Sequence, residues 1–343
     1  MLPAKKITRI IVIIFLTIAA YGSWLFFGSS TTFEEPRKNF YLRTGSNLHS
    51  IANDLKTGGF IRDKGIFTLL AKAMNFDKYR AGKYEFEKGV NMFTIIRTLK
   101  AFRETQVQLV ITKLRTKEDL ARKLGKNFEC DSARFMQIFN NNDSLQRYGL
   151  DTNTVMAAII PNTYNFYWAT SCRKIFSRLK QEQDKFWTAE RQAKAKKLNL
   201  TSLQVYTLAS IVEEETNKAE DKGKIASVYL NRLQKGMRLG ADPTIKFALK
   251  DFGLKRIYHK HLTVPSPYNT YQITGLPPGP ICTPSAGTID AVLDAPATPY
   301  LFFAARPDFK GYSSFAVTYA EHLKNARAYQ LALDSLMKAK AGK

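Results

Sequence analysis

Cysteine is scarce in this sequence: its 343 residues include three, Cys130, Cys172 and Cys282, and no pair has CxxC spacing. An odd number excludes a framework in which every cysteine is paired. A Cys130–Cys172 bridge is compatible with an oxidising compartment, but buried free thiols are the favoured interpretation.

The signature motifs of several enzyme classes are also missing. There is no GxSxG elbow, Walker loop, GxGxxG or HExxH. His259 and His261 lie two residues apart without a third ligand at convincing spacing, so no metal site and no cofactor is expected. Residues 177–180 (SxxK) and 56–58 (KTG) match fragments of penicillin-binding motifs, but their order is reversed and no SDN accompanies them.

Acidic residues are outnumbered, 29 against 52 Lys and Arg, and the net charge is +23. Such a surplus indicates either an anionic partner or a generally basic surface. No RNP-like or zinc-finger motif accompanies the charge, and an apolar N-terminal run argues against a nucleic-acid partner. No nucleic acid is therefore expected.

That run covers residues 10–27 (IIVIIFLTIAAYGSWLFF), and no charge occurs between Arg9 and Glu34. Its length approaches the ~20 residues of a spanning helix and exceeds the ~7–15 of a cleaved signal-peptide core. We therefore expect an uncleaved transmembrane helix at 10–28. The basic residues before it place the tail, 1–9, in the cytoplasm and everything after Gly28 outside it.

Beyond a linker at 29–39, residues 40–112 have the pattern of a small α+β module. A strand leads to an amphipathic helix that Ser46 is expected to cap and Gly58-Gly59 to end, and Asn91 can cap a later helix.

Residues 113–343 form a second, mixed α+β domain, so the predicted fold class is α+β. A strand at 107–113 leads into it. A Pro/Gly-rich span, 264–299, indicates a rigid loop, because its prolines exclude a continuous helix or central strand. Helices are expected around four ranges: 132–149, 173–198, 202–218 and 220–235.

The most informative segment is the third of these helices. Thr201 and Gln204 form a capping box, and apolar residues then recur at the spacing of a buried face: Leu208, Ile211 and Val212. Glu215 falls on the centre of that face, whereas Glu213 and Glu214 point elsewhere. Desolvation raises the pKa of such a carboxyl, which suits a general acid; a buried ion pair with Lys or Arg is the alternative.

Six blocks in order resemble the MltG (YceG-like) endolytic murein transglycosylases: Leu208–Thr216 (LASIVEEET), Ile225–Leu233 (IASVYLNRL), Gly236–Leu239 (GMRL), Asp242–Thr244 (DPT), Tyr268–Tyr271 (YNTY) and Gly275–Gly279 (GLPPG). The resemblance implies a YceG-like catalytic domain at 113–343 and a LysM-like domain at 40–112. It maps the catalytic glutamate, which directly precedes a threonine, onto Glu215.

Within these blocks, five residues are candidates for binding sugars or positioning Glu215: Asp242, Thr244, Tyr268, Asn269 and Thr270. Each can instead simply hold its loop. The sequence departs from the family pattern at Asn162, where the family has aspartate, at Ser313 or Ser314, where a histidine is frequent, and at Leu323, which replaces asparagine after His322.

The resemblance implies a lyase that cuts the MurNAc-β-1,4-GlcNAc bond of nascent peptidoglycan strands and leaves 1,6-anhydroMurNAc ends, so terminating strands. It further implies that the protein is located at the cell (inner) membrane with its catalytic domain in the periplasm. Peptidoglycan synthases are its implied partners. Two alternatives stay open: a hydrolytic muramidase using Glu215 with Glu213 or Asp242, and a non-catalytic membrane-tethered scaffold.

Overall fold

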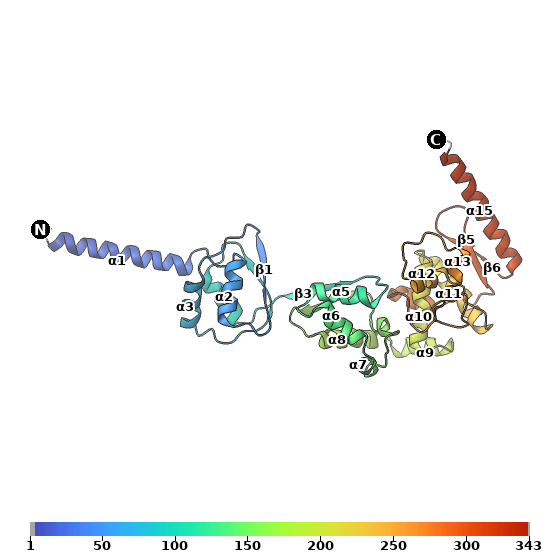
Figure 1. The fold of residues 1–343 in the computed structure, drawn as a ribbon, viewed down its shortest axis with the longest axis horizontal. Coiled ribbons are helices and arrows are strands. Elements are labelled where there is room, and N and C mark those ends of the chain that lie inside the picture. Colours follow the sequence, from blue (N-terminus) through green and yellow to red (C-terminus); the bar gives the residue numbers. More distant parts are fainter. Residues whose placement is uncertain (1–3, 342–343) are drawn as a thin grey trace. The chain divides into compact units, whose positions relative to one another are not determined.

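The computed structural model describes residues 4–341, and the fold is mixed α+β (Figure 1). The chain divides into two compact units. The first takes in the residues up to Leu109, together with 127–130 and 165–171. The second holds 110–126, 131–164 and 172 onward. The domain boundary predicted at 112 stays a prediction, since the first unit also takes in segments beyond it.

The N-terminal helix, α1, runs from Ala4 to Phe27 and covers the run predicted to span a membrane. Apolar side chains along it are exposed, Phe15 by 69%. Within the described part of the chain, no helix has the length and apolar character that a membrane span requires. The span assigned to 10–28 is therefore not shown by the structure.

The rest of the first unit pairs two strands and packs helices against them. Antiparallel pairing of the strands places Phe40 opposite Tyr84, and both side chains are buried. Asn47, not Ser46, caps the helix Leu48–Thr57, one residue later than predicted. The predicted cap at Asn91 is confirmed. The elements are β1 (Arg37–Leu42), α2 (Leu48–Thr57), α3 (Lys64–Ala73), β2 (Gly82–Glu87) and α4 (Met92–Lys100).

The following elements are mostly helical, with two short ladders, β3 with β4 and β5 antiparallel to β6. In order they are β3 (Gln106–Ile111), α5 (Lys117–Asn127), α6 (Ser132–Phe139), α7 (Asn142–Gln146), a 3-10 turn (Val155–Ala158), β4 (Asn162–Tyr167), α8 (Cys172–Phe186), α9 (Ala189–Lys197), α10 (Ser202–Glu215), α11 (Ala219–Gln234), α12 (Asp242–Leu249), α13 (His259–Leu262), α14 (Ala286–Leu293), β5 (Phe302–Ala305), β6 (Ser313–Ala316) and α15 (Tyr319–Ala341).

Two of the predicted helices are each divided in two. The range 132–149 breaks before α7, where the Asn141 side chain accepts from the backbone of Ser144 and starts a new helix. The range 173–198 breaks before α9, which Thr188 caps in the same way. The Pro/Gly-rich span contains a helix, α14, capped by Ser285. In all three places a capping side chain sets the helix start.

Helix α10 forms the centre of the second unit's core. Eight consecutive residues, 205–212, are buried, so the helix is enclosed on all sides. The predicted capping box of Thr201 and Gln204 is present. Ser210 accepts a 3.0 Å hydrogen bond from the backbone N–H of Ile281, which ties the proline-rich loop to α10 beside its C-terminal turn.

The cysteines differ from the expectation of free thiols. Cys130 and Cys172 are disulfide-bonded. Cys282 is free and buried, and burial raises the pKa of its thiol. The sequence allowed this bridge but favoured free thiols, because pairing depends on which segments the fold brings together.

Candidate active site

Three consecutive glutamates at the end of α10 face three different environments, beginning with Glu213. Its carboxylate pairs with the Lys222 ammonium at 2.9 Å and accepts hydrogen bonds from the hydroxyls of Ser285, at 3.1 Å, and Thr288. Burial opposes ionisation, but the hydrogen bonds from Thr288 and Lys222 outweigh it and lower the pKa of Glu213. The three contacts, all to Oε2, thus favour an ionised Glu213 carboxylate.

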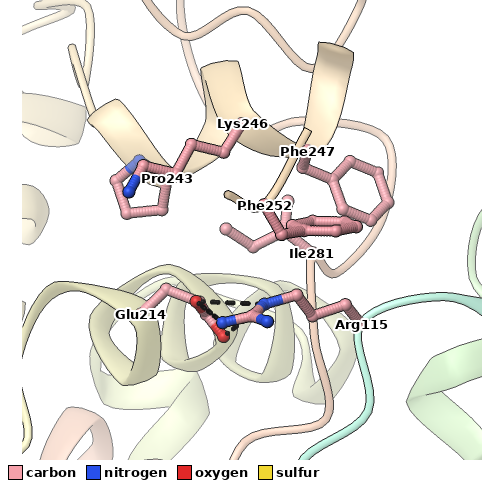
Figure 2. A pocket seen from close by; sticks show the side chains of 7 residues that line it. All are labelled: Arg115, Glu214, Pro243, Lys246, Phe247, Phe252 and Ile281. Carbon is pink, nitrogen blue, oxygen red and sulfur yellow. Dashed lines mark hydrogen bonds and ion pairs between the residues drawn. The ribbon is translucent and has the colours of Figure 1, made fainter. Parts of the chain in front are cut away.

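Glu214 turns to a second set of cations. Arg115 donates to both of its carboxylate oxygens, with Nη2 to Oε2 at 2.9 Å, and the Lys113 ammonium lies 3.0 Å from Oε1. Figure 2 shows the Arg115 guanidinium directed at this carboxylate. Burial acts against it, but the hydrogen bonds from Arg115 and Lys113 lower the pKa of Glu214.

Glu215 has no salt bridge among the described residues and receives one strong hydrogen bond: the Tyr229 hydroxyl donates to Oε1 at 2.5 Å. Desolvation by burial raises the pKa of Glu215 to about 7, against the lowering effect of Tyr229. Both protonation states are therefore populated near neutral pH, as acid and base catalysis by one group requires. The residue retains some exposure, so its carboxyl is desolvated without being sealed off.

Tyr229 is a direct contact of Glu215 that the sequence reasoning missed. It lies on α11, is 1% exposed, and packs edge-to-face against Phe303 with ring centroids 5.9 Å apart. The packed ring fixes where the hydroxyl points. A usable signal was present, since a tyrosine in a buried helical face requires a polar partner for its hydroxyl.

A buried cation lies close enough to influence the same carboxyl. Arg232 donates to the backbone carbonyls of Leu239, at 2.5 Å, and Leu301, at 2.7 Å, and its guanidinium lies over Phe302. Its charge lowers the pKa of Glu215, but less than burial raises it. These contacts hold the cation beside Glu215 without forming a salt bridge that would fix the carboxylate as ionised.

Of the predicted binding residues, Asp242 is the one the structure brings to Glu215. It is exposed at the start of α12 and accepts a 2.6 Å hydrogen bond from the Tyr271 hydroxyl. Its negative charge contributes to the raised pKa of Glu215. Tyr271 was not predicted as a site residue, although it ends the Tyr268–Tyr271 block.

Three other candidates are completely buried and hold the loop together. The Thr244 and Thr270 hydroxyls lie 2.9 Å apart, and Thr270 also accepts from the N–H of Ala241. The Asn269 amide donates to two backbone carbonyls, those of Leu262 and Val264. These contacts match the loop-holding alternative, and direct contact with a substrate remains a prediction.

Tyr268, the last candidate, is half-buried and packs against Phe247 with ring centroids 4.7 Å apart. Burial raises the pKa of its hydroxyl to about 12, so Tyr268 is neutral and able to donate. It lines a cavity of about 170 Å³ together with Asn153 and Lys250. Its role as a sugar-binding residue remains a prediction.

The two neighbouring histidines, His259 and His261, lie on the short helix α13, where His261 Nδ1 accepts from the N–H of Tyr258. Among the described residues, no three His, Cys, Asp or Glu side chains are grouped so that they could hold a metal ion. His322 lies nearer the site: it stacks on Phe302, and burial lowers its pKa.

The fold and the site define an α+β protein whose central buried helix ends in a desolvated glutamate poised between acid and base. The chain belongs to the YceG-like family, whose model matches residues 40–328.

Comparisons with individual proteins agree with this family assignment. A Bacillus subtilis protein named endolytic murein transglycosylase is 29% identical, over 85% of this chain and 84% of its own length. A Streptococcus pneumoniae protein of the same name is 26% identical over 76% of this chain, which spans 53% of that longer relative. The crystal structure of a YceG-like protein from Listeria monocytogenes matches with a TM-score of 0.56 at 26% identity, covering 85% of this chain and 99% of that one.

Proposed function

We propose that this chain is an endolytic lytic transglycosylase that cuts the MurNAc-β-1,4-GlcNAc bond of peptidoglycan strands and leaves 1,6-anhydroMurNAc ends. The observation that carries the proposal is the Glu215 carboxyl, whose pKa burial raises to about 7 while its neighbours Glu213 and Glu214 are held ionised. The relatives' shared name, endolytic murein transglycosylase, supports the same activity.

In the first step, protonated Glu215 donates its proton to the glycosidic oxygen as the bond from that oxygen to the muramoyl anomeric carbon breaks. The GlcNAc side leaves as an alcohol, and the muramoyl carbon becomes positive in character. Asp242, whose charge acts on Glu215, can stabilise that carbon electrostatically. The carboxylate left on Glu215 is stabilised by the hydrogen bond from Tyr229.

In the second step, the muramoyl 6-hydroxyl attacks its own anomeric carbon. The Glu215 carboxylate takes the hydroxyl proton, so the enzyme returns to its starting state and no water is consumed. Because the nucleophile belongs to the substrate, one titrating carboxyl is sufficient, provided that the site holds the 6-hydroxyl near attack distance.

The hydrolytic alternative requires a second carboxylate to activate water or to act as nucleophile. Glu213 does not suit that role, since Lys222, Ser285 and Thr288 all donate to its Oε2 and hold the carboxylate in place. Asp242 is the remaining candidate, because it is exposed and electrostatically coupled to Glu215. A reducing muramic acid end in the product would identify this reaction.

We further propose that residues 10–27 tether the chain to the cytoplasmic (inner) membrane, with the enzyme on its outer side. The support is the uncharged run itself, the basic residues before it, and the disulfide bonding of Cys130 and Cys172, which suits an oxidising compartment. Partitioning into the membrane fraction that survives alkaline carbonate washing tests the tether.

Residues 40–112 then act as a LysM-like glycan-binding module. In support, β1, α2, α3 and β2 follow one another in β-α-α-β order, with the two strands paired antiparallel. A glycan-binding module beside a membrane tether would hold strands as they grow at the membrane. The synthases that make those strands would then be neighbours of this enzyme. Loss of strand binding on deletion of this module, with the second unit still folded, is the expected result.

The decisive experiment is mass spectrometry of the products formed when the full chain in detergent, or its Glu215→Gln variant, is incubated with uncrosslinked peptidoglycan strands. Anhydromuramoyl ends from the parent alone support the transglycosylase. Reducing ends support the hydrolase, and unchanged strands in both samples support the scaffold alternative.

A further inference from the structure

A cavity of about 320 Å³ lies in the second unit at the start of α10, and no step of the proposed reaction uses it. Its volume is within the range of ~300–1,000 Å³ that is typical of small-molecule sites. One wall is a single face of α8 and the residue after it, formed by four residues three or four positions apart: Lys180, Gln183, Asp184 and Trp187.

The cavity is separate from the carboxyl that the proposed reaction uses. Ser202 and Leu203, which line it, belong to the first turn of α10, whereas Glu215 is the last residue of that helix. At 1.5 Å per residue, the two ends of α10 lie roughly 20 Å apart. A ligand in this cavity would therefore bind without touching Glu215.

Two polar atoms of the lining residues have no hydrogen-bond partner among the described residues: Oε1 of Gln183, which can accept, and Nε1 of Trp187, which can donate. Both side chains are buried, with exposed fractions of 9% and 6%. The N–H of Trp187 donates to the carbonyl of Gln183 at 3.3 Å, so the side chains lie one helical turn apart on the same face. Because buried polar atoms are nearly always paired, this acceptor and donor point to a ligand that supplies one N–H and one carbonyl.

The cavity carries no net charge, although the protein as a whole has a charge of +23. Among the residues that line it, the charged ones are Lys180 and Asp184. These two form a salt bridge with each other across one turn of α8. The balance favours a neutral ligand, because an ionised one would lose its hydration without gaining a free counter-charge.

Much of the rest of the lining is apolar. Leu150, Ala157 and Leu203 contribute aliphatic side chains. The hydroxyl of Tyr206 already donates to the carbonyl of Ile159 at 2.5 Å, so this residue offers the cavity its ring alone. Such a surface suits a methyl group better than a second polar group.

We propose that this cavity binds the acetamido group of an N-acetylglucosamine unit of the glycan strand, an inference that rests on the proposed function. The acetamido N–H donates to Gln183 Oε1, the acetamido carbonyl accepts from Trp187 Nε1, and the methyl group packs against the aliphatic lining. N-acetylglucosamine is neutral, whereas N-acetylmuramic acid carries a lactyl carboxylate or a peptide stem. The uncharged cavity therefore favours the glucosamine unit.

The first test measures binding without any cleavage. N-acetylglucosamine is titrated into the ¹⁵N-labelled full chain in detergent, and NMR follows the indole N–H signal of Trp187, which is identified by its loss in Trp187→Phe. We expect a saturable shift with a Kd in the range of about 1–10 mM, equal in the parent and in Glu215→Gln, and none with glucose, which lacks the acetamido group. Because Glu215→Gln is included, the result does not depend on whether strands are cut. An equal response to both sugars, or to neither, would overturn the proposal.

Gln183→Leu removes the acceptor, and Gln181→Leu makes the same change at an exposed position of α8 as the matched control. We expect Gln183→Leu to lose the response to N-acetylglucosamine while its unfolding temperature stays the same or rises, because a buried unpaired acceptor is gone. The control should keep the parental response. Sugar binding retained in Gln183→Leu would overturn the proposal. A lowered unfolding temperature would show that Gln183 is already paired in the free protein, and that result would overturn it too.

A final comparison identifies the source of the amide. N-acetylalanine methylamide, a neutral peptide-like amide, is titrated beside the sugar, and tighter binding of this compound would assign the cavity to a peptide and overturn the proposal. With uncrosslinked strands, Gln183→Leu should have a KM raised several-fold, up to about tenfold, and an unchanged kcat. An unchanged KM would remove the strand as the ligand of this cavity.

Discussion

Tyr229 donates a 2.5 Å hydrogen bond to Oε1 of Glu215 and thereby joins α11 to the last turn of α10. Burial favours the neutral acid, whereas this hydrogen bond favours the carboxylate. The two opposing effects leave the pKa of Glu215 at about 7. The pair is therefore suited to a cycle in which one carboxyl first releases and then recovers a proton.

Glu215→Gln should abolish strand cleavage while the protein stays folded. The amide fills the same space but can neither donate nor take up the proton, so we expect a loss on the order of 10²–10⁴-fold in anhydro-end formation. Product counting by mass spectrometry measures it. The matched control, Glu190→Gln at a side chain 77% exposed, should keep parental activity; an active Glu215→Gln variant would remove Glu215 from the reaction.

Tyr229→Phe should shift the pH profile rather than only reduce the rate. Without the donated hydrogen bond the pKa of Glu215 rises, and because the reaction starts from the protonated acid, the descending limb of kcat/KM moves to higher pH. Cleavage rates between pH 5 and pH 9 measure this shift. A uniform loss with an unmoved limb would mean that Tyr229 only packs.

The raised pKa also predicts how stability depends on pH. Between 4.5, the ordinary value, and about 7, the folded protein keeps a proton that the unfolded chain has released, so stability falls as pH rises through this window. The interval corresponds to roughly 3 kcal/mol. Urea unfolding at pH 5 and pH 8 should show this fall in the parent beyond that in Glu215→Gln, and parallel curves would contradict it.

Part of this site could be predicted from local spacing. Leu208, Ile211 and Val212 identified the side of α10 on which Glu215 lies, and all three are buried. The choice of Glu215 stays a prediction, because α10 is enclosed on every side and burial alone does not single out one face. The separate environments of Glu213 and Glu214 are set by cations on other segments. Those cations, Lys113, Arg115 and Lys222, lie outside α10, so no helical period connects them to its glutamates.

Contacts between segments far apart in the sequence also account for the site and disulfide features that were not predicted. The Tyr229 hydroxyl meets Glu215 through the packing of two helices, and the disulfide bonding of Cys130 and Cys172 depends on tertiary structure. Helix ends were missed for a different reason. Asn141 and Thr188 restart helices within apolar patterns that continue across the break, and a periodicity alone does not distinguish such a restart from a surface residue.

Lys222→Met should destabilise the protein without changing the pH profile of cleavage. It leaves the Glu213 carboxylate, which is 15% exposed, without its cation, and we expect a loss of about 3 kcal/mol in the free energy of unfolding. Urea unfolding measures it, with Lys224→Met, an exposed neighbour on α11, as control. Equal stability of the two variants would show that the hydroxyls of Ser285 and Thr288 alone sustain Glu213.

Asp242→Asn should move the pH profile in the direction opposite to Tyr229→Phe. The Asp242 charge raises the pKa of Glu215, so its removal lowers that pKa and brings the descending limb of kcat/KM to lower pH. The amide oxygen can still accept from the Tyr271 hydroxyl, which preserves the 2.6 Å contact. Product analysis at the new optimum also decides between mechanisms: a lytic enzyme continues to form anhydro ends at a reduced rate, because its nucleophile is the substrate's own hydroxyl. A hydrolase that depends on Asp242 to activate water would form neither product.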